Sequence, residues 1–143
     1  MLSKTCEYGI RATIFIALQS LMGMRTSLKY IAEEIDSPEA FTAKILQKLV
    51  RVKIIESSKG VNGGFNMASD RIKSTSVLDI VYAIDGYDIC NRCVLGLSQC
   101  SSNNPCSVHH KFRPVREDLI ALMNKTTVEE MALGIKDKLA ILR

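Results

Sequence analysis

Residues 36–67 decide the fold, and their sequence is DSPEAFTAKILQKLVRVKIIESSKGVNGGFNM. The first three residues predict a turn, in which Ser37 is of a helix-capping type and Pro38 suits the first helical position. A helix is therefore expected over 38–53. The remainder contains two short strand-like pieces on either side of the Gly/Asn-rich tip at 60–64, which predicts a β-hairpin.

The helix expected over 38–53 has two distinct faces. At 100° per residue, an arc of about 80° holds its apolar side chains, which are Phe41, Ile45, Leu49 and Val52. A neighbouring arc of about 100° holds polar and basic side chains, which are Lys44, Gln47, Lys48 and Arg51. One face can pack inward while the other presents two lysines and an arginine. A basic helix face is most often only a solvated surface, so the neighbouring elements are needed to judge whether this face binds a partner.

Two helices are expected before this region. Residues 4–22 predict a helix capped by Ser3, with apolar residues on more than one side. Residues 28–35 predict a short second helix with Ser27 as its cap. Helix, short helix, turn, helix and hairpin is the element order of a winged helix-turn-helix, whose recognition helix enters the DNA major groove.

The second half of the chain predicts three more helices and one loop. Capping-box patterns at Ser76 and Thr127 indicate helix starts, and Gly86 marks a helix end. A loop is expected over 87–108, followed by a helix over 110–124. In that helix an apolar stripe favours packing against a second copy of the chain, against the rest of the same chain, or both. Its residues are Leu119, Leu122 and Met123.

The expected fold is therefore mostly α with a small β-hairpin wing, a winged helix-turn-helix followed by a C-terminal dimerisation helix. Three regions are expected. Residues 1–86 form the winged helix-turn-helix DNA-binding domain, and 87–109 form a cysteine-rich sensor loop. Residues 110–143 form the dimerisation helix and the C-terminal helix.

Composition supports a globular protein with a polyanionic partner. The chain has 143 residues, of which 47% are hydrophobic and 24% are charged, and its net charge is +4. Residues 1–75 carry 11 Lys/Arg and 7 Asp/Glu, whereas residues 76–143 carry 8 of each. The excess charge therefore lies in the half that contains the expected winged helix. No signal peptide or membrane-spanning run is apparent, so a cytoplasmic location without membrane association is expected.

Four of the five cysteines lie close together in the expected loop. Thiolates and imidazoles at this density suit zinc or an iron–sulfur cluster, and clustered cysteines in the cytosol are more often metal ligands or redox groups than disulfides. Cys6 is instead expected to be a small core residue of the first helix. The pattern in the loop is Cys90-x2-Cys93-x6-Cys100-x5-Cys106-x2-His109-His110.

Three motifs give the chain a family resemblance, and they are Glu7–Ala12, Ile55–Phe65 and Leu78–Gly86. Along nearly its whole length the chain resembles the Rrf family of bacterial winged-helix transcription regulators. The resemblance implies a homodimeric regulator, not an enzyme, that binds a partly palindromic operator in double-stranded DNA and acts as a repressor. The family's wing usually has Arg where this chain has Lys59, and some members have Glu where it has Ala43. The operator therefore cannot be inferred from another member.

The helix face, the wing and the resemblance together assign eight residues to DNA contact. They are Ser27, Thr42, Lys44, Gln47, Lys48, Arg51, Lys59 and Asn62. The two lysines and the arginine on the helix, with the lysine in the wing, are expected near phosphate.

The resemblance also implies that the loop holds a 2Fe–2S cluster that senses iron–sulfur, redox or nitric oxide status. The implied ligands are Cys93, Cys100, Cys106 and His109, with Glu7 as a competing fourth ligand that could reach across the dimer.

Other interpretations of the loop stay open. One is a structural zinc site at Cys90, Cys93, Cys106 and His109. Another is a metal-free thiol switch. Cys90 has no place in the implied ligand set, and it is a free thiol, a substitute ligand or the disulfide partner of Cys93. A thiol redox enzyme using the same pair is the remote alternative, because the βαβ context of such motifs is absent.

Overall fold

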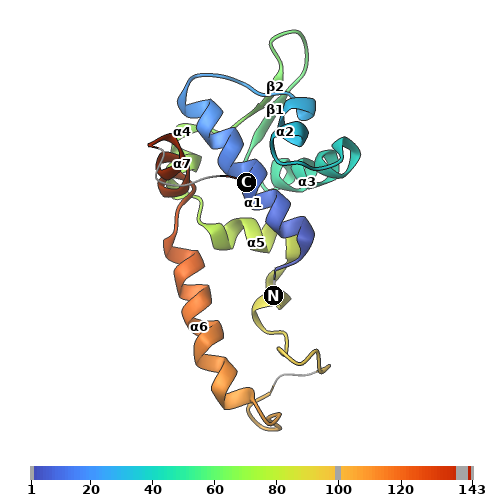
Figure 1. The fold of residues 1–143 in the computed structure, drawn as a ribbon, viewed down its shortest axis with the longest axis vertical. Helices are drawn as coiled ribbons and strands as arrows, with labels where there is room; N and C mark the ends of the chain where they lie inside the picture. The colour runs from blue at the N-terminus through green and yellow to red at the C-terminus, as the bar shows by residue number, and fades with distance from the viewer. Residues whose placement is uncertain (1, 99–100, 138–141, 143) are drawn as a thin grey trace.

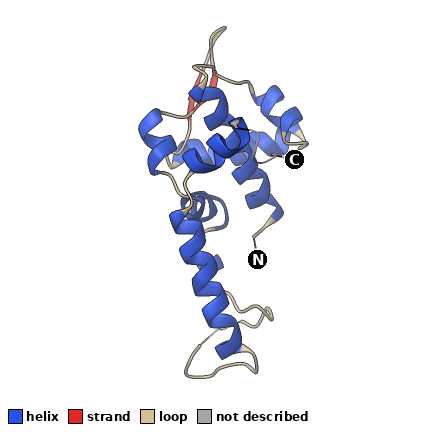
Figure 2. Cartoon of the chain, turned by 60° about the vertical axis from the view of Figure 1, so that its left-hand side comes forward, coloured by secondary structure: helices blue, strands red, loops and turns tan. Residues whose placement is uncertain are grey.

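The computed structural model of the chain describes residues 2–98, 101–137 and 142 (Figure 1). Most of the described residues are helical, and the two strands among them form an antiparallel hairpin (Figure 2). The predicted fold class, mostly α with a β-hairpin wing, is confirmed. The elements are α1 (Lys4–Leu21), α2 (Leu28–Glu34), α3 (Glu39–Arg51), β1 (Glu56–Ser58), β2 (Gly64–Asn66), α4 (Ser69–Ser74), α5 (Val77–Asp85), the 3-10 helix η1 (Tyr87–Cys90), α6 (His109–Lys125) and α7 (Val128–Lys136).

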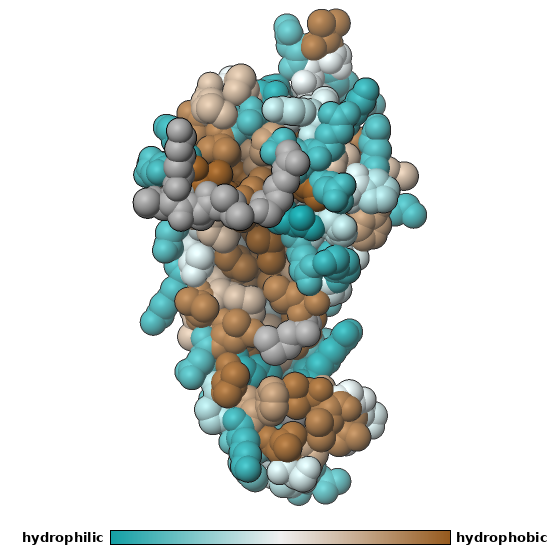
Figure 3. All heavy atoms as spheres, viewed as in Figure 1, coloured by the Kyte–Doolittle hydropathy of each residue, from teal (hydrophilic) through white to brown (hydrophobic). Residues whose placement is uncertain are grey.

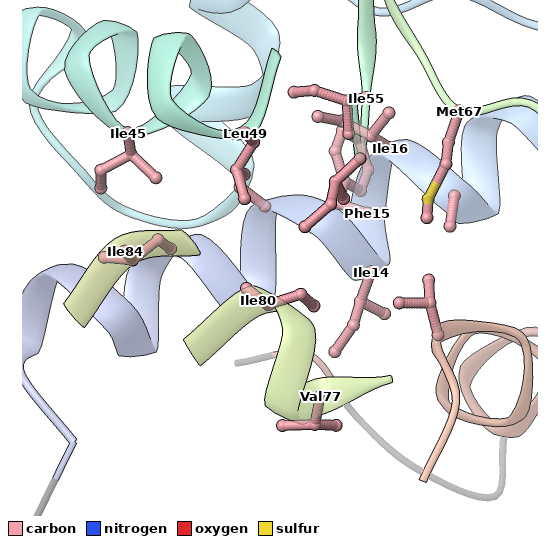
Figure 4. Close-up of a cluster of buried hydrophobic side chains, with 14 of the residues drawn as sticks. Ile14, Phe15, Ile16, Ile45, Leu49, Ile55, Met67, Val77, Ile80 and Ile84 are labelled. Carbon is pink, nitrogen blue, oxygen red and sulfur yellow. The ribbon is translucent and has the colours of Figure 1, made fainter. Parts of the chain in front are cut away.

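Helix α1 runs through the middle of the body and contacts α2, α3, α4, α5, α7 and β2. Ser3 caps it as predicted, because its hydroxyl accepts the backbone N–H of Cys6 at 3.0 Å. Side chains of α1 face α3, α5 and the hairpin at once (Figure 4). Burial on several sides explains why α1 has apolar residues on more than one side rather than in a single stripe. The buried apolar residues of α1 are Cys6, Ala12, Ile14, Phe15, Ile16 and Ala17.

A glycine allows α1 to approach α5 and α3 closely. A Cβ atom on Gly9 would lie 2.0 Å from Cδ1 of Ile84 in α5 and 3.3 Å from Cγ2 of Ile45 in α3. The preceding residue, Tyr8, packs edge-on against the Phe41 ring at a centroid distance of 5.8 Å. The motif at 7–12 therefore sets the position of α3 through direct packing.

Helix α3 begins at Glu39, and two details of its predicted start were wrong. Pro38 is the N-cap residue rather than the first helical residue, and the buried hydroxyl of Ser37 makes no hydrogen bond, so Ser37 does not cap the helix. The turn before α3 instead uses Asp36 in the left-handed region at φ 51°. Aspartate tolerates that conformation better than most residues.

The inward face of α3 is rotated from the predicted one. Val52, predicted to face the core, lies at the helix end and is 46% exposed. Leu46, which the predicted face omitted, is fully buried because α3 is held between α1, α2 and α5. The buried residues of α3 are Thr42, Ile45, Leu46 and Leu49.

The wing is fixed at its base to the loop between α1 and α2. Ser57 pairs with Phe65 in the hairpin, and Phe65 also forms a bridge to Thr26 through two backbone hydrogen bonds of 3.0 and 2.8 Å. A Cβ atom on Gly64 would lie 2.7 Å from the Thr26 carbonyl oxygen, and its φ is +127°. Glycine is required there by both the close approach and the conformation.

A second backbone bridge joins the start of α5 to the end of α6. Val77 donates to the Thr126 carbonyl at 2.9 Å, and Val128 donates to the Thr75 carbonyl at 2.9 Å. Helix α7 then packs on α1 and α4, whereas α6 extends along the long axis away from the wing (Figures 1 and 2). The capping box at Ser76 is present as predicted. No helix in the described ranges is long and apolar enough to cross a membrane.

Replacing Gly9 with Ala should lower the free energy of unfolding by about 1–2 kcal/mol, because the new methyl group overpacks the contact with Ile84 and Ile45. Urea unfolding followed by circular dichroism measures this change. The matched control is Gly134→Ala in α7, where a Cβ meets nothing within 4 Å. That variant should gain about 0.5–1 kcal/mol. A Gly9→Ala protein as stable as the wild type would contradict the packing argument.

Candidate functional site

The outward face of α3 presents four of the side chains assigned to DNA contact. Lys44, Gln47, Lys48 and Arg51 are all exposed. Thr42 is fully buried, and its hydroxyl donates to the Pro38 carbonyl oxygen at 3.0 Å. Because Thr42 lies on the inner side of the helix, its assignment to DNA contact is contradicted by the structure.

Lys48 differs from its basic neighbours on α3. Its ammonium group donates to the backbone carbonyl oxygen of Ile84, at the end of α5, over 3.1 Å. The side chains of Lys44 and Arg51 have no hydrogen bond or ion pair within the described parts of the chain. On this face the charges of Lys44 and Arg51 are therefore available to contact a ligand, whereas the ammonium group of Lys48 is already hydrogen-bonded.

The wing and its surroundings add further polar groups to this end of the molecule. Lys59 and Asn62 are exposed in the turn of the hairpin. Ser27 is exposed, and its hydroxyl accepts the backbone N–H of Tyr30 at 3.2 Å as the N-cap of α2.

Sequence reasoning did not identify one basic residue at this surface, Arg25. The guanidinium of Arg25 donates to the Ser58 hydroxyl of β1, which places it beside the wing. In the sequence Arg25 is only a charge in a loop. Its location depends on the pairing of Thr26 with Phe65, a contact between residues far apart in the chain.

A cavity of about 240 Å³ lies between α5, at Val81, the Cys-rich segment (residues 87–108) and α6. Cys90, Cys93, Cys106 and His109 all line it. Apolar side chains gather over this lower part of the molecule (Figure 3), and those lining the cavity include Val81, Ile89, Leu119, Ile120 and Met123. The cavity thus combines soft metal-ligating groups with apolar walls.

The implied ligands are distributed as follows. Cys93 is buried and Cys106 is half-buried. His109 is 5% exposed at the start of α6, and its Nε2 lies 3.4 Å from the Ser102 hydroxyl. Cys100 lies outside the described residues.

Glu7 does not line this cavity. Its carboxylate pairs with the Lys4 ammonium at 2.7 Å on the solvent side of α1. This hydrogen bond and the lysine charge lower the pKa of Glu7.

The donor types suit an iron–sulfur cluster or zinc, and three of the implied ligands face one space. Within residues 2–98, 101–137 and 142, however, no three His, Cys, Asp or Glu side chains are grouped closely enough to hold a metal ion. Cys100, the fourth implied ligand, lies outside these ranges. Cys90 and Cys93 are thiols in this structure and are not joined in a disulfide.

Specific contacts hold the Cys-rich segment to the helices on either side. The Tyr82 ring of α5 lies 4.4 Å from the Tyr87 ring of η1, between centroids. A side-chain hydrogen bond with Cys90 raises the pKa of Tyr82. Arg116 of α6 donates to the Arg92 carbonyl oxygen at 3.2 Å. A rearrangement of the Cys-rich segment would therefore change its contacts with both α5 and α6.

The fifth cysteine belongs to the core, as predicted. Cys6 is fully buried in the core cluster. Burial, with a further contribution from the Asp85 carboxylate, raises the pKa of Cys6 to about 12.

Helix α6 leaves part of its apolar surface uncovered. Leu119 and Met123 pack against the core of the same chain, whereas Leu122 is 62% exposed. Phe112 and Val115 are also exposed, and they continue the line of Leu122 at helical spacing.

Comparisons with known proteins agree with this architecture. The family model Rrf2, described as an iron-dependent transcriptional regulator, matches residues 2–133. A protein of Aquifex aeolicus, provisionally described as an HTH-type transcriptional regulator, is 30% identical over 95% of this chain and 93% of its own length. The HTH-type transcriptional regulator IscR of Klebsiella pneumoniae is 25% identical over 91% of this chain and 78% of its own length.

Two solved structures have the same fold. The first is CymR, the global cysteine regulator of B. subtilis, with a TM-score of 0.74 and 19% identity over 93% of this chain and 96% of CymR. The second is IscR of T. potens, with a TM-score of 0.73 and 18% identity over 99% of this chain and 92% of that protein.

Native protein treated with iodoacetamide at pH 8 should be modified at Cys90 and Cys106 well before Cys6. With a pKa of about 12, only about one Cys6 in ten thousand is a thiolate at that pH, and the thiolate is the reactive form. Peptide mass spectrometry over time measures the order, and denatured protein provides the control in which Cys6 reacts. Equal modification of Cys6 and Cys106 in the native protein would contradict its placement in the core.

Proposed function

The chain belongs to the Rrf2 family of transcriptional regulators, and from that premise we propose how it reads DNA and what it senses. It is a DNA-binding regulator of the HTH type. We propose that it acts as a homodimeric repressor at a partly palindromic operator. We further propose that a 2Fe–2S cluster in the Cys-rich segment controls this activity.

The main support for DNA binding by α3 is the division of this helix into a buried face and an exposed polar face. Ile45 and Leu49 lock one side of the helix into the core, and Lys44, Gln47 and Arg51 project from the other. A helix held in this way can enter a major groove, with the lysine and arginine near phosphates and the glutamine near base edges.

The wing extends the proposed contact beyond α3. Lys59 and Asn62 lie in its exposed turn, and Arg25 is bonded to its first strand. Because Phe65 ties the wing to Thr26, these groups keep a fixed relation to the start of α2, where Ser27 lies. Such groups would position the protein on the sugar-phosphate backbone rather than select a sequence.

Dimerisation through α6 is supported by its uncovered apolar line. Phe112, Val115 and Leu122 face solvent in one chain, and a two-fold axis would bury them against the same residues of a second copy. A two-fold dimer presents two α3 helices to half-sites about one DNA turn apart, which accounts for a partly palindromic operator.

The donor set around the cavity supports the cluster. Cys93, Cys106 and His109 would be ligands, with Cys100 as the remaining thiolate. A bound 2Fe–2S cluster supplies one-electron redox chemistry and sensitivity to oxidants. Glu7 does not line the cavity of its own chain and pairs with Lys4, so it would compete for the fourth position only from a partner chain.

The coupling proposed between the two functions follows from how the Cys-rich segment is attached. Binding of a cluster would change the segment between Gly86, where α5 ends, and His109, where α6 starts. The first end is close to α3 and the second begins the proposed dimer helix. A switch results if the cluster-bound arrangement of the segment favours one spacing of the dimer's two α3 helices over another.

Lys44→Ala and Arg51→Ala should each weaken operator binding and lower the slope of log K against log[salt] by about 0.9, because each removes one phosphate contact. Fluorescence anisotropy with a duplex selected by the wild-type protein from a random library measures both quantities. Lys125→Ala, an exposed lysine at the end of α6, is the control and should change neither. Wild-type affinity of both α3 variants at every salt concentration would contradict the DNA-reading role of α3.

Protein purified without air should contain about two iron and two sulfide per chain and absorb broadly between about 300 and 600 nm. Cys93→Ser and Cys106→Ser should lose both signals. Cys90→Ser, which changes a thiol of the same cavity outside the proposed ligand set, should keep them. Bound zinc without sulfide would contradict the cluster and favour a structural zinc site, and absence of any metal would favour a thiol switch.

A further inference from the structure

Lys48 makes a contact that a DNA-binding lysine does not need. Its Nζ donates to the carbonyl oxygen of Ile84 at 3.1 Å, across 36 positions of the chain. Ile84 belongs to the last turn of α5, where backbone carbonyls lack a partner within the helix. A lysine ammonium at a helix C-terminus satisfies such a carbonyl and complements the negative end of the helix dipole.

The contact lies where α3 and α5 pack together. Ile84 of α5 and Ile45 of α3 both reach the position of Gly9 in α1, so the three helices meet at one point. Lys48 follows Ile45 by three residues and lies beside this point. Apolar packing alone allows a helix to rotate slightly about its axis, whereas a directed hydrogen bond restricts that rotation.

We propose that Lys48 is a positioning residue, which sets the rotation of α3 against the end of α5 instead of meeting a DNA phosphate. Lys44 and Arg51, on the same exposed face, carry the charge that contacts the phosphates. This inference rests on the proposed DNA-reading role of α3 and deepens it, because it divides the basic residues of one helix into two roles.

The same turn of α5 holds two other parts of the molecule. The Asp85 carboxylate accepts the backbone N–H of Ser3 at 2.9 Å, which fixes the start of α1. Gly86, at φ 80°, then begins the path into the Cys-rich segment. Lys48 is therefore a polar link between the reading helix and the helix end from which that segment departs.

The test compares Lys48→Met, Lys48→Arg and Lys44→Ala in the full-length protein. Lys48→Met keeps the length of the side chain and removes its charge and donors. It should weaken binding of the selected duplex about tenfold, which is the size of one charge-assisted hydrogen bond. Its slope of log K against log[salt] should match the wild type, whereas Lys44→Ala should lose about 0.9. Lys48→Arg should recover most of the affinity, because a guanidinium can donate to the same carbonyl.

Either of two results would overturn the proposal. A salt slope of Lys48→Met lowered as in Lys44→Ala would make Lys48 a phosphate contact. Wild-type affinity of Lys48→Met would remove the positioning role. Affinities are compared at temperatures where urea unfolding shows each variant to be fully folded. If Lys48→Met does not fold, Lys48→Leu, which also lacks charge and donors, takes its place under the same criteria. Failure of Lys44→Ala and Arg51→Ala to change the slope would instead count against the proposed DNA-reading role.

Discussion

The close packing of α1 on α5 at Gly9 is the constraint on which the rest of the structure depends. With no side chain at that position, Ile84 of α5 and Ile45 of α3 reach the same point on α1. Helix α3 therefore takes its position from α1 and α5 as well as from its short neighbour α2. Two of the three motifs that carry the family resemblance, those at 7–12 and 78–86, are the two sides of this contact.

The residues proposed to read DNA lie apart from those proposed to sense, and α5 lies between the two groups. Positive charge is concentrated in the first half of the chain, with α3 and the wing, and the cavity lined by Cys90, Cys93, Cys106 and His109 lies toward the other end (Figure 1). The last turn of α5 contacts α3, holds the start of α1 and leads into the Cys-rich segment. A change in that segment thus has a short path of packed groups to the recognition helix, with no movement of the wing required.

Local signals in the sequence predicted most of the helices, because caps such as Ser3 and Ser76 and helical spacing act within a few residues. These local signals failed where the role of a residue depends on contacts with residues far away in the sequence. Thr42 was named for DNA contact although its side chain is buried, because packing against α1, α2 and α5 sets the rotation of α3. The six-residue α4 was missed because one turn and a half carries little periodicity. The roles of Arg25 and Lys48 depend on partners 33 and 36 positions away.

In the proposed mechanism, the state of the Cys-rich segment changes how the protein binds its operator. The most direct measurement compares the affinity of cluster-loaded and cluster-free protein for the same selected duplex, without air and at one salt concentration. We expect a difference of about five- to 150-fold, the usual range for coupling between two sites, with the same salt slope in both states because the phosphate contacts are unchanged. Equal affinities of the loaded and cluster-free protein would contradict it.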